Sequence, residues 1–414
     1  MKLDRQVPSW SHLWRWLSPS FRDRPDRWTQ VRTVEDFARL ARRRTPRSVY
    51  DYVDGAAETE ASSRRNVEAF RQLVFHPHVL RDVSSVDIGT TVLGRRISFP
   101  VVLGPTGFTR MMHAGGETAV ARAAARAGLP YTLSTLGTTS IERLDTSGDR
   151  WFQLYLWKDR GRSRDLISRA AAAGYSTLVL TADVPVAGAR LRDLHNGLTM
   201  PPTLSTRTLL GMARRPRWVA DALTTEPLSF ESLGEPKDLM SLINSVFEPA
   251  VTMADVAWLR QSWSGSLVVK GILRRDDARN AVDAGADGIA VSNHGGRQLD
   301  RAATPLEALP GVVDAVAGRA EVYLDGGVRS GADVAAVVAL GARAAFVARP
   351  YLYALMAGGE RGVDHLLGCF KSDYTRTVQL LGAAGTEQLH SDMVALPTAG
   401  GSSLRPAPRR PSGW

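Results

Sequence analysis

The stretch Gly288 to Asp300, GIAVSNHGGRQLD, places polar and charged residues directly after a short apolar run. Ile289 to Val291 predicts a buried strand, and His294 and Arg297 follow it. An imidazole can take up a proton near neutral pH, and a guanidinium can bind a carboxylate or phosphate through two parallel hydrogen bonds. This stretch therefore predicts a site with a base and a cation, although the same residues also occur in ordinary polar loops.

Similar polar endings follow the other short apolar runs of the chain, which favours a site over a loop. They supply carboxylates, amides, hydroxyls, a lysine and further arginines, and such a set is unfavourable to bury without a ligand. Besides His294 and Arg297, the residues at these endings are Pro105, Thr106, Gly107, Ser134, Gln153, Tyr155, Thr181, Asp183, Lys270, Ser292, Asp325, Gly326, Gly327, Arg329 and Arg349.

The apolar runs alternate with Ala-rich segments of helical period, and this rhythm predicts the elements that position the polar endings. Short, continuously apolar strands separated by helices indicate a parallel sheet covered by helices, and eight such units predict a closed (β/α)8 barrel, the TIM barrel of the α/β class. The predicted strands are Val101 to Leu103, Tyr131 to Leu133, Phe152 to Leu156, Thr177 to Leu180, Leu267 to Val269, Ile289 to Val291, Glu321 to Leu324 and Ala344 to Val347. The predicted helices are Glu117 to Ala127, Arg164 to Ala173, Asp276 to Ala284, Pro305 to Val316 and Ala332 to Leu340.

The carboxyl ends of barrel strands meet at one face, so the polar endings should surround one opening. Several cations around that opening would repel one another unless anions lay between them. The segments DGGVRSG at 325–331 and ARP at 348–350 follow the last two predicted strands, where barrels commonly bind a phosphate through backbone N–H groups. The sequence therefore predicts that one bound anion is the phosphate of a cofactor.

The parts of the chain outside the barrel differ in composition from it. Residues 1–32 are basic and irregular, and WSHLWRW at 10–16 predicts either an arm packed on the surface or a short amphipathic anchor. The catalytic unit is expected over 33–396, interrupted at about 184–251 by an insertion too long for an ordinary turn. Residues 397–414 are rich in Pro, Gly, Ser and Arg, which predicts a disordered tail.

Two helices are expected before the first barrel strand. Val34 to Arg44 has helical spacing, and Pro46 begins a second helix that contains YDYVDGAAE at 50–58. A connecting region then runs to about Phe99, with HPH at 76–78. Two histidines without a third ligand nearby do not predict a metal site, so no metal is expected.

Composition and charge limit the location and the partners. Cys369 is the single cysteine, which excludes an intrachain disulfide and fits a reducing compartment. No signal-peptide pattern opens the chain, and no apolar run reaches about 18 residues. The net charge of +10 favours anionic partners, but the arginines are dispersed outside any nucleic-acid motif. We therefore expect a cytoplasmic protein, free or attached to the inner face of the cell membrane, that does not bind nucleic acid.

The chain resembles the FMN-dependent L-2-hydroxy acid oxidases and dehydrogenases, from about Val34 to Asp392. Within that family it is most similar to the actinobacterial branch of L-lactate dehydrogenases, which pass electrons to acceptors other than NAD. The motifs that carry the family resemblance are SNHGGRQLD, LVVKG, FQLY, LTADVP and LDGGVRSG, and those that carry the branch are PVAGARLRD at 185–193 and YLYALMAGGERGV at 351–363.

This resemblance implies a role for each polar ending. His294 is the expected base, oriented by Asp183, whose carboxylate stabilises the imidazolium that forms. The expected substrate ligands are Arg190, Arg297 and Tyr52, with Tyr155 near the reacting hydroxyl. Lys270 is expected beside the N1 and O2 edge of the flavin, where its charge favours the reduced ring. The other expected FMN contacts are Pro105, Thr106, Gly107, Ser134, Gln153, Thr181, Ser292, Asp325, Gly326, Gly327, Arg329, Ala348 and Arg349.

The reaction implied by the resemblance is oxidation of a small L-2-hydroxy acid, with L-lactate to pyruvate as the first expectation. His294 would take the hydroxyl proton as hydride leaves Cα, and abstraction of the Cα proton is the open alternative. Electrons would pass to a quinone, a cytochrome or oxygen. A larger aryl hydroxy acid or a natural-product intermediate is the alternative substrate, and a homotetramer is the assembly that the family implies.

Three positions depart from the pattern of the family. Gly107 stands where many oxidases have Ala, and Leu136 stands where glycolate oxidase has Trp. Both leave room above the flavin, which favours a substrate larger than glycolate. Ala348 replaces a usual Gly beside Arg349, and its methyl group predicts weaker binding of FMN.

The insertion has two open interpretations. Its segment RRPRWV at 214–219 is basic and contains a tryptophan, which suits an anionic lipid surface, and in some relatives the corresponding insertion touches the membrane. A mobile lid over the substrate is the equally weighted alternative.

Overall fold

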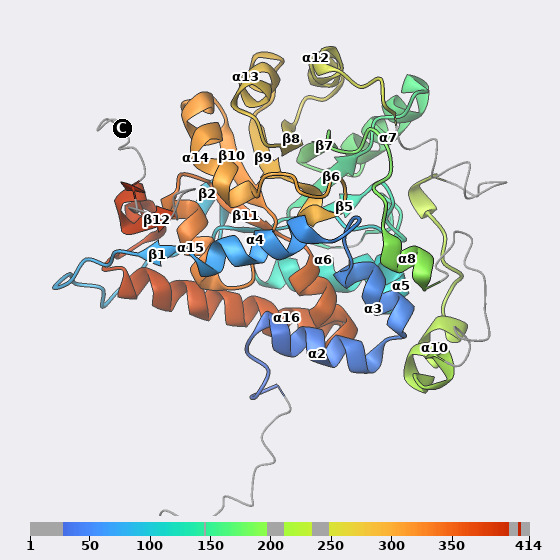
Figure 1. The fold of residues 1–414 in the computed structure, drawn as a ribbon. Helices are drawn as coiled ribbons and strands as arrows, with labels where there is room; N and C mark the ends of the chain where they lie inside the picture. The colour runs from blue at the N-terminus through green and yellow to red at the C-terminus, as the bar shows by residue number, and fades with distance from the viewer. Residues whose placement is uncertain (1–27, 145, 197–210, 234–247, 397–404, 407–414) are drawn as a thin grey trace, which may run out of the picture. The chain divides into compact units, whose positions relative to one another are not determined.

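A closed barrel of eight parallel strands forms the centre of the unit that spans residues 33–414 (Figure 1). This computed structural model describes residues 28–144, 146–196, 211–233, 248–396 and 405–406. Every predicted strand is present, which confirms the (β/α)8 fold. In their order around the barrel, the strands are β4 (Val101–Leu103), β5 (Tyr131–Ser134), β6 (Arg150–Leu154), β7 (Thr177–Thr181), β8 (Ser266–Ile272), β9 (Gly288–Ser292), β10 (Glu321–Asp325) and β11 (Ala344–Val347), and β11 pairs with β4 to close the ring.

Two boundaries differ from the predicted ones in a way that concerns the site. β6 ends at Leu154, so Tyr155 follows the strand and does not lie within it. β8 continues past Lys270 to Ile272, with a register shift against β9 at this point. Lys270 is therefore held inside a strand, which fixes its direction more firmly than a loop would.

Helices cover the outside of the barrel. The five predicted ones end within one residue of the expected position, and the helices Met253–Ser262 and Arg349–Leu380 were not predicted. Thr304 and Ser330 cap the starts of two of the predicted helices in capping boxes. Gly174, Gly285 and Gly341 follow three helix ends with positive φ, a conformation that glycine adopts without strain. The helices are α6 (Gly116–Arg126), α7 (Arg160–Ala172), α12 (Met253–Ser262), α13 (Arg275–Asp283), α14 (Pro305–Val316), α15 (Gly331–Ala339) and α16 (Arg349–Leu380).

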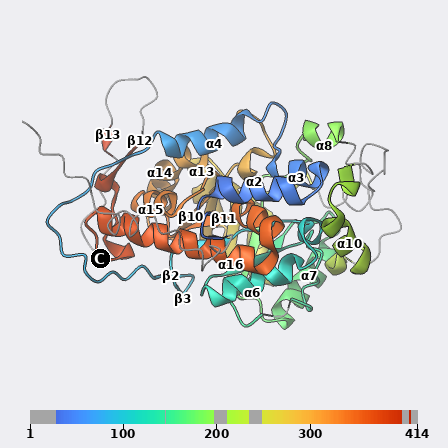
Figure 2. The ribbon, with the colours of Figure 1, turned by 90° about the horizontal axis from the view of Figure 1, so that it is seen from below.

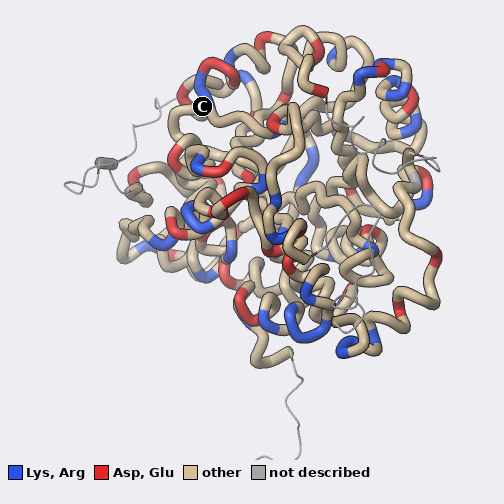
Figure 3. The backbone as a smooth tube through the Cα atoms, turned by 45° about the vertical axis from the view of Figure 1, so that its right-hand side comes forward, with Lys and Arg blue, Asp and Glu red and all other residues tan. Residues whose placement is uncertain are grey.

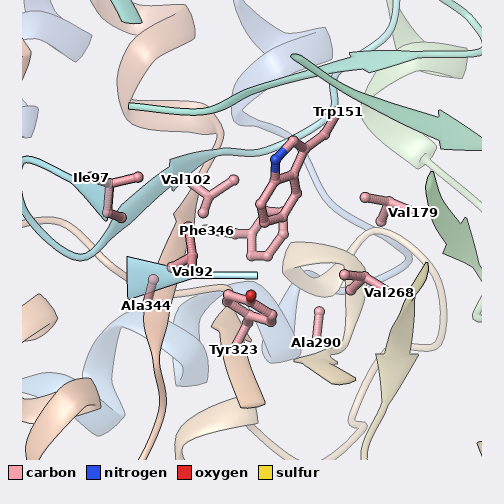
Figure 4. Packing of buried hydrophobic residues seen from close by; sticks show 10 residues of the cluster. All are labelled: Val92, Ile97, Val102, Trp151, Val179, Val268, Ala290, Tyr323, Ala344 and Phe346. Atoms are coloured by element: carbon pink, nitrogen blue, oxygen red, sulfur yellow. The ribbon is translucent and has the colours of Figure 1, made fainter. Parts of the chain in front are cut away.

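The barrel interior is a packed aromatic and aliphatic core (Figure 4). Trp151, Tyr323 and Phe346 meet edge to face, with ring centroids 5.6 to 6.0 Å apart. Small and branched residues on the other strands fill the space around them, as the tapering interior of such a barrel requires. The hairpin of β2 (Thr90–Val92) and β3 (Arg95–Ile97) adds further apolar side chains to this cluster.

Three helices precede the barrel, and one of them was not predicted. They are α2 (Val34–Arg44), α3 (Arg47–Asp54) and α4 (Ala61–Arg71), and α2 lies along α16 (Figures 1 and 2). The prediction that the second helix includes residues up to 58 is wrong, because α3 ends at Asp54 and the chain turns at Gly55. α4 falls within the region that the sequence suggested to be a connection.

After residue 396 the structure describes only Arg405–Pro406, so the predicted disorder of residues 397–414 stays a prediction. Arg405–Pro406 form strand β13, which pairs with β12 (Val394–Leu396), and β12 pairs with β1 (Val74–Phe75). The other residues after 396 lie outside the described residues, as does the WSHLWRW segment of the arm. Figure 3 shows Lys and Arg interspersed with Asp and Glu around the described part of the chain.

The insertion carries three short elements in its described parts. They are α8 (Leu191–His195), α10 (Pro216–Thr224) and the 3-10 turn η1 (Glu231–Leu233). Phe230 is 2% exposed and packs on Phe108 with ring centroids 4.5 Å apart, so this part of the insertion is fixed to the barrel. Among the described residues, no helix is long and apolar enough to cross a membrane.

Asp300 fastens the start of α4 to the loop after β9. Its carboxylate accepts hydrogen bonds from the backbone N–H of Ser62 at 2.8 Å and of Thr59 at 3.2 Å, and from the Thr59 hydroxyl. Burial disfavours its charge, but the hydrogen bonds from Thr59 and Ser62 outweigh burial and hold the pKa of Asp300 below its ordinary value.

Asp300→Asn should flatten the acid side of the stability profile. A lowered folded-state pKa stabilises the protein fully above the unfolded pKa of about 4 and progressively less as the pH falls below it. The urea midpoint of the wild type should therefore fall more steeply than that of the variant between about pH 5 and pH 3. Asp283→Asn, at an exposed ion pair with Arg319, is the matched control and should keep the slope of the wild type. Equal slopes for all three proteins would contradict the role of Asp300.

Candidate active site

A single cavity at the carboxyl ends of the strands gathers most of the predicted site residues. All of the predicted site residues except Asp183, Gln153 and Ser292 line this cavity. Each of these three forms a hydrogen bond with a residue of the lining, namely His294, Ser134 and Asp325 respectively. The predicted residues in the lining are Tyr52, Pro105, Thr106, Gly107, Ser134, Tyr155, Thr181, Arg190, Lys270, His294, Arg297, Asp325, Gly326, Gly327, Arg329, Ala348 and Arg349.

His294 and Asp183 form a direct pair. The Nδ1 atom of His294 lies 2.9 Å from Oδ1 of Asp183. Burial disfavours the charge of Asp183, but His294 and then Lys270 outweigh it and keep the pKa of this carboxyl below its ordinary value. The carboxylate therefore stays charged and fixes the imidazole ring, leaving Nε2 as the nitrogen that can exchange a proton with a ligand.

The backbone of His294 is strained. Its φ of 56° places a residue with a Cβ in the left-handed region, which costs roughly 1–2 kcal/mol. The hydroxyl oxygen of Ser292 accepts a hydrogen bond from the His294 N–H at 2.9 Å, and Gly295 and Gly296 continue the left-handed conformation. Such strain persists only where the surroundings hold it, and it is concentrated at functional sites.

Two guanidinium groups and a phenol ring line one end of the cavity, and the positive charge of the guanidinium groups suits this end to bind an anion. The guanidinium carbons of Arg190 and Arg297 lie 5.3 and 5.2 Å from the ring centroid of Tyr52. Burial, followed by the like charge of Arg190, lowers the pKa of Arg297 to about 10, so it still carries its charge at pH 7. Nη1 of Arg297 donates to the carbonyl oxygens of Tyr52 and Gly55 at 2.8 Å. Two neighbouring cations with remaining donors favour a bound carboxylate.

Lys270 belongs to a buried polar network on strands β8, β9 and β10. Its ammonium group lies 2.9 Å from Oδ2 of Asp325, and its Nζ lies 3.2 Å from the hydroxyl of Ser292. Burial opposes its charge, but Asp325 and Asp183 outweigh burial and raise the pKa of Lys270. Burial also raises the pKa of Tyr155 to about 12, so its phenol stays protonated and can donate a hydrogen bond at pH 7.

The polar groups on the neighbouring strands fit a cofactor with a polar ring edge. The hydroxyl of Ser134 donates to Oε1 of Gln153 at 2.8 Å, which fixes the orientation of this buried amide. The Nε2 atom of Gln153 has no hydrogen-bond partner among the described residues. A buried donor without an acceptor is unfavourable, and an oxygen or nitrogen at the edge of the flavin of FMN would satisfy it. Gln153, Ser134 and Lys270 are thus suited to hold the ring.

The loops after β10 and β11 provide the phosphate end. Gly326 and Gly327 have φ values of 119° and 89°, and a Cβ at Gly327 would lie 2.3 Å from the carbonyl oxygen of Asn66, so only glycine fits there. The Arg329 guanidinium donates, within the described residues, to the carbonyl of Val328 alone. It therefore keeps donors for a phosphate.

Arg349 is more fully engaged than the sequence suggested. Its Nε, Nη1 and Nη2 atoms donate to the carbonyl oxygens of Val53, Gly295 and Gly55 at 2.8 to 2.9 Å. Arg349 lines the cavity, as predicted, but it also fastens the turn after α3 to the turn that carries His294.

The three departures from the family pattern lie in the lining of the cavity. Gly107 packs on Leu136, and a Cβ at position 107 would lie 3.1 Å from the Cβ and the carbonyl oxygen of Leu136. An alanine there would therefore crowd Leu136 and narrow the cavity. Ala348 has a φ of −123°, which any residue adopts, so its methyl group adds no backbone strain, and weaker FMN binding stays a prediction.

Several residues of the site were not predicted. Gln298 and Val184 line the cavity, and Asn293 and Asn66 form a buried pair behind it. Gln298 and Asn293 are neighbours of predicted residues within the motif SNHGGRQLD, so their position in this motif could have indicated that they belong to the site. Asn66 belongs to the unpredicted helix α4, and nothing in its local sequence indicates a partner in the barrel.

Comparisons with known proteins agree with this geometry. Residues 41–396 match the family of FMN-dependent dehydrogenases. The chain is 49% identical over 396 residues to a Mycobacterium tuberculosis protein provisionally named L-lactate dehydrogenase, covering 94% of this chain and 96% of that one. It is 42% identical to the L-lactate dehydrogenase of Alcaligenes faecalis, covering 88% of this chain and 98% of the relative.

A solved structure of similar fold is that of the monotopic membrane protein (S)-mandelate dehydrogenase. It has a TM-score of 0.85 and 38% identity, and the match covers 89% of this chain and all of that one. Family model, relatives and fold agree, and the cavity holds the polar groups that FMN requires. The chain belongs to the family of FMN-dependent dehydrogenases.

Proposed function

We propose that this protein oxidises a small L-2-hydroxy acid, L-lactate in the first place, to the corresponding 2-keto acid. The observation that carries the proposal is the placement of Arg190, Arg297 and Tyr52 in the same cavity as the His294–Asp183 pair. This arrangement offers two cations for a carboxylate and a fixed base for the adjacent hydroxyl. The names of the bacterial relatives support L-lactate as the substrate.

Each side chain of the site has a proposed role that follows from its chemistry. Arg190 and Arg297 bind the substrate carboxylate and fix its rotation, and protonated Tyr155 donates a hydrogen bond to the oxygen that becomes the ketone. Nε2 of His294 takes the hydroxyl proton, and charged Asp183 stabilises the resulting imidazolium. Bound FMN supplies the two-electron acceptor chemistry. Lys270 would help to hold the flavin ring, and its positive charge would favour the reduced form of that ring.

A larger aryl hydroxy acid is the second candidate substrate. Gly107 and Leu136 leave space in the cavity that Ala and Trp would fill. One solved structure of similar fold is that of a mandelate oxidase variant with (S)-mandelic acid, at 37% identity and a TM-score of 0.76. A panel of glycolate, L-lactate, D-lactate and L-mandelate, each mixed anaerobically with the FMN-loaded protein, separates the two candidates by the rate at which the flavin bleaches.

Several finer assignments are proposals as well. The cytoplasmic location and the division into an arm over 1–32, a catalytic barrel over 33–396 and a tail over 397–414 rest on composition and sequence pattern. The homotetramer, the electron transfer to a quinone, a cytochrome or oxygen, and the single-residue roles above rest on the family resemblance.

His294→Asn should retain FMN but bleach with L-lactate at least about a hundredfold more slowly than the wild type, because asparagine cannot accept the hydroxyl proton. Stopped-flow absorbance under anaerobic conditions measures this rate, and flavin absorbance of the purified protein measures retention. His390→Asn, outside the cavity lining, is the control and should bleach normally. Normal bleaching of the His294 variant would overturn the assignment of the base.

We propose further that α10 contacts an anionic membrane surface. Trp218 is partly buried, and its Nε1 donates to the carbonyl of Met111 at 3.1 Å, so its polar edge is directed to the barrel. The exposed residues of α10 and of the residues just before it include Arg214, Arg217, Asp221 and Leu223, and Leu223 is 80% exposed. Two cations and an exposed leucine on one short segment suit a surface of anionic lipids.

Reversing the two exposed charges should weaken membrane binding. The double variant Arg214→Glu, Arg217→Glu should partition onto vesicles containing phosphatidylserine at least about tenfold less than the wild type, since each basic residue near such a surface contributes about 1 kcal/mol. Vesicle flotation measures the partition. The control is the double variant Arg275→Glu, Arg279→Glu on α13. It makes the same change of net charge and should partition onto the vesicles as the wild type does. Unchanged flotation of the α10 variant would favour the lid interpretation of the insertion.

A further inference from the structure

The turn that carries His294 has an unusual backbone, because three consecutive residues have positive φ. The φ values are 56° for His294, 62° for Gly295 and 76° for Gly296. Glycine adopts this region freely, but His294 does not. The turn therefore needs contacts from outside its own strand to keep the imidazole in place.

The side chain of Asn293 supplies the first of these contacts. Its Oδ1 accepts a hydrogen bond from the N–H of Gly296 at 3.1 Å, and its Nδ2 donates to the carbonyl of Ala303 at 3.1 Å. These two bonds join the start and end of the turn to the chain that leaves it. They depend on one rotamer of Asn293, with its oxygen and nitrogen on fixed sides.

Asn66 on α4 fixes that rotamer. Nδ2 of Asn66 donates to Oδ1 of Asn293, and Nδ2 of Asn293 donates to Oδ1 of Asn66, both at 2.8 Å. Asn66 is 2% exposed and Asn293 is 5% exposed, so water does not compete for either amide. With these bonds the Asn293 amide uses both of its donors and accepts two hydrogen bonds, and a flipped amide would face donor against donor.

Helix α4, which carries Asn66, packs directly against the turn that carries His294. A Cβ at Gly296 would lie 2.5 Å from the backbone nitrogen of Ser63, so the turn and α4 are in direct backbone contact. Asp300 binds the N–H of Ser62 from the other side of the turn. α4 therefore stands in a defined position relative to His294, although neither Asn66 nor Asn293 lines the cavity.

We propose that Asn66 is a positioning residue for His294, acting through the amide of Asn293. It holds the left-handed turn in the conformation that directs Nδ1 of His294 to Asp183. Arg297, three residues on, has its own bonds to the carbonyls of Tyr52 and Gly55 and does not depend on Asn66. The inference rests on the proposed function, since it assigns Asn66 to the base of that reaction.

Asn66→Ala should therefore lower the rate of flavin reduction and leave the substrate affinity nearly unchanged. At saturating L-lactate the rate should fall by about a hundredfold, the effect of a displacement of about 1 Å in a reacting group. The substrate Kd from the same stopped-flow titration should change by less than about threefold, and FMN content should be unchanged, because Arg297 and Arg329 keep their contacts. Val120→Ala on α6, a buried site outside the cavity lining, is the control for a general loss of stability.

A double-mutant cycle tests whether Asn66 acts through Asn293. The variant Asn66→Ala, Asn293→Ala should reduce flavin no more slowly than Asn293→Ala alone, since the second change removes a partner that is already lost. Additive losses would overturn the inference, and so would an Asn66→Ala protein with the reduction rate of the wild type. If Asn66→Ala does not fold, Asn66→Asp, which keeps the volume and the acceptor for Nδ2 of Asn293 but turns the donor to its Oδ1 into an acceptor, should show a loss of rate in the same direction with an unchanged substrate Kd. Failure of the wild type to bleach with any 2-hydroxy acid would instead contradict the proposed function.

Discussion

Five cationic side chains share the mouth of one barrel, and their mutual repulsion is the constraint that the surrounding structure must meet. They are Arg190, Lys270, Arg297, Arg329 and Arg349, which all line the same cavity. Like charges this close are tolerated only where carboxylates, carbonyl oxygens or ligands lie between them. The positions of the other polar groups in the site follow from this requirement.

The compensation differs from cation to cation, and the difference suggests which of them bind ligands. Lys270 is paired with Asp325 at 2.9 Å, and Arg349 is surrounded by three backbone carbonyls. Arg297 has two carbonyl partners, while Arg190 forms an ion pair with Asp193 at 3.5 Å. The Arg329 guanidinium donates, among the described residues, to the carbonyl oxygen of Val328 alone. Positive charge is thus poorly compensated at two places, beside Tyr52, where the substrate carboxylate is proposed to bind, and at Arg329, where the phosphate is proposed to bind.

The segment before the barrel contributes to the site as much as the strands do. The last turn of α3 supplies Tyr52, and together with Gly55 it supplies carbonyl oxygens that Arg297 and Arg349 bind. α4 supplies the amide partner of Asn293 and the backbone against which Gly296 and Gly327 pack. These contacts tie the base, the substrate arginines and the phosphate loops to one rigid support, and a rigid support keeps reacting groups within the small tolerances that catalysis requires.

The sequence by itself determined the barrel and most of the site. Eight apolar runs of strand length, separated by helices, require a parallel sheet covered by helices, and this number of units favours a closed barrel, in which the polar residues after each run meet at one face. His294, Asp183, Arg297 and Lys270 were predictable in this way because each lies at or beside a strand end. The tertiary structure alone decided the pairing of Asn66 with Asn293, which are 227 residues apart, the carbonyl partners of Arg349 and the docking of Trp218 on the barrel. A hydrogen bond between distant segments leaves no periodic pattern in either one, because it depends on how whole elements pack and not on the residues next to it in the chain.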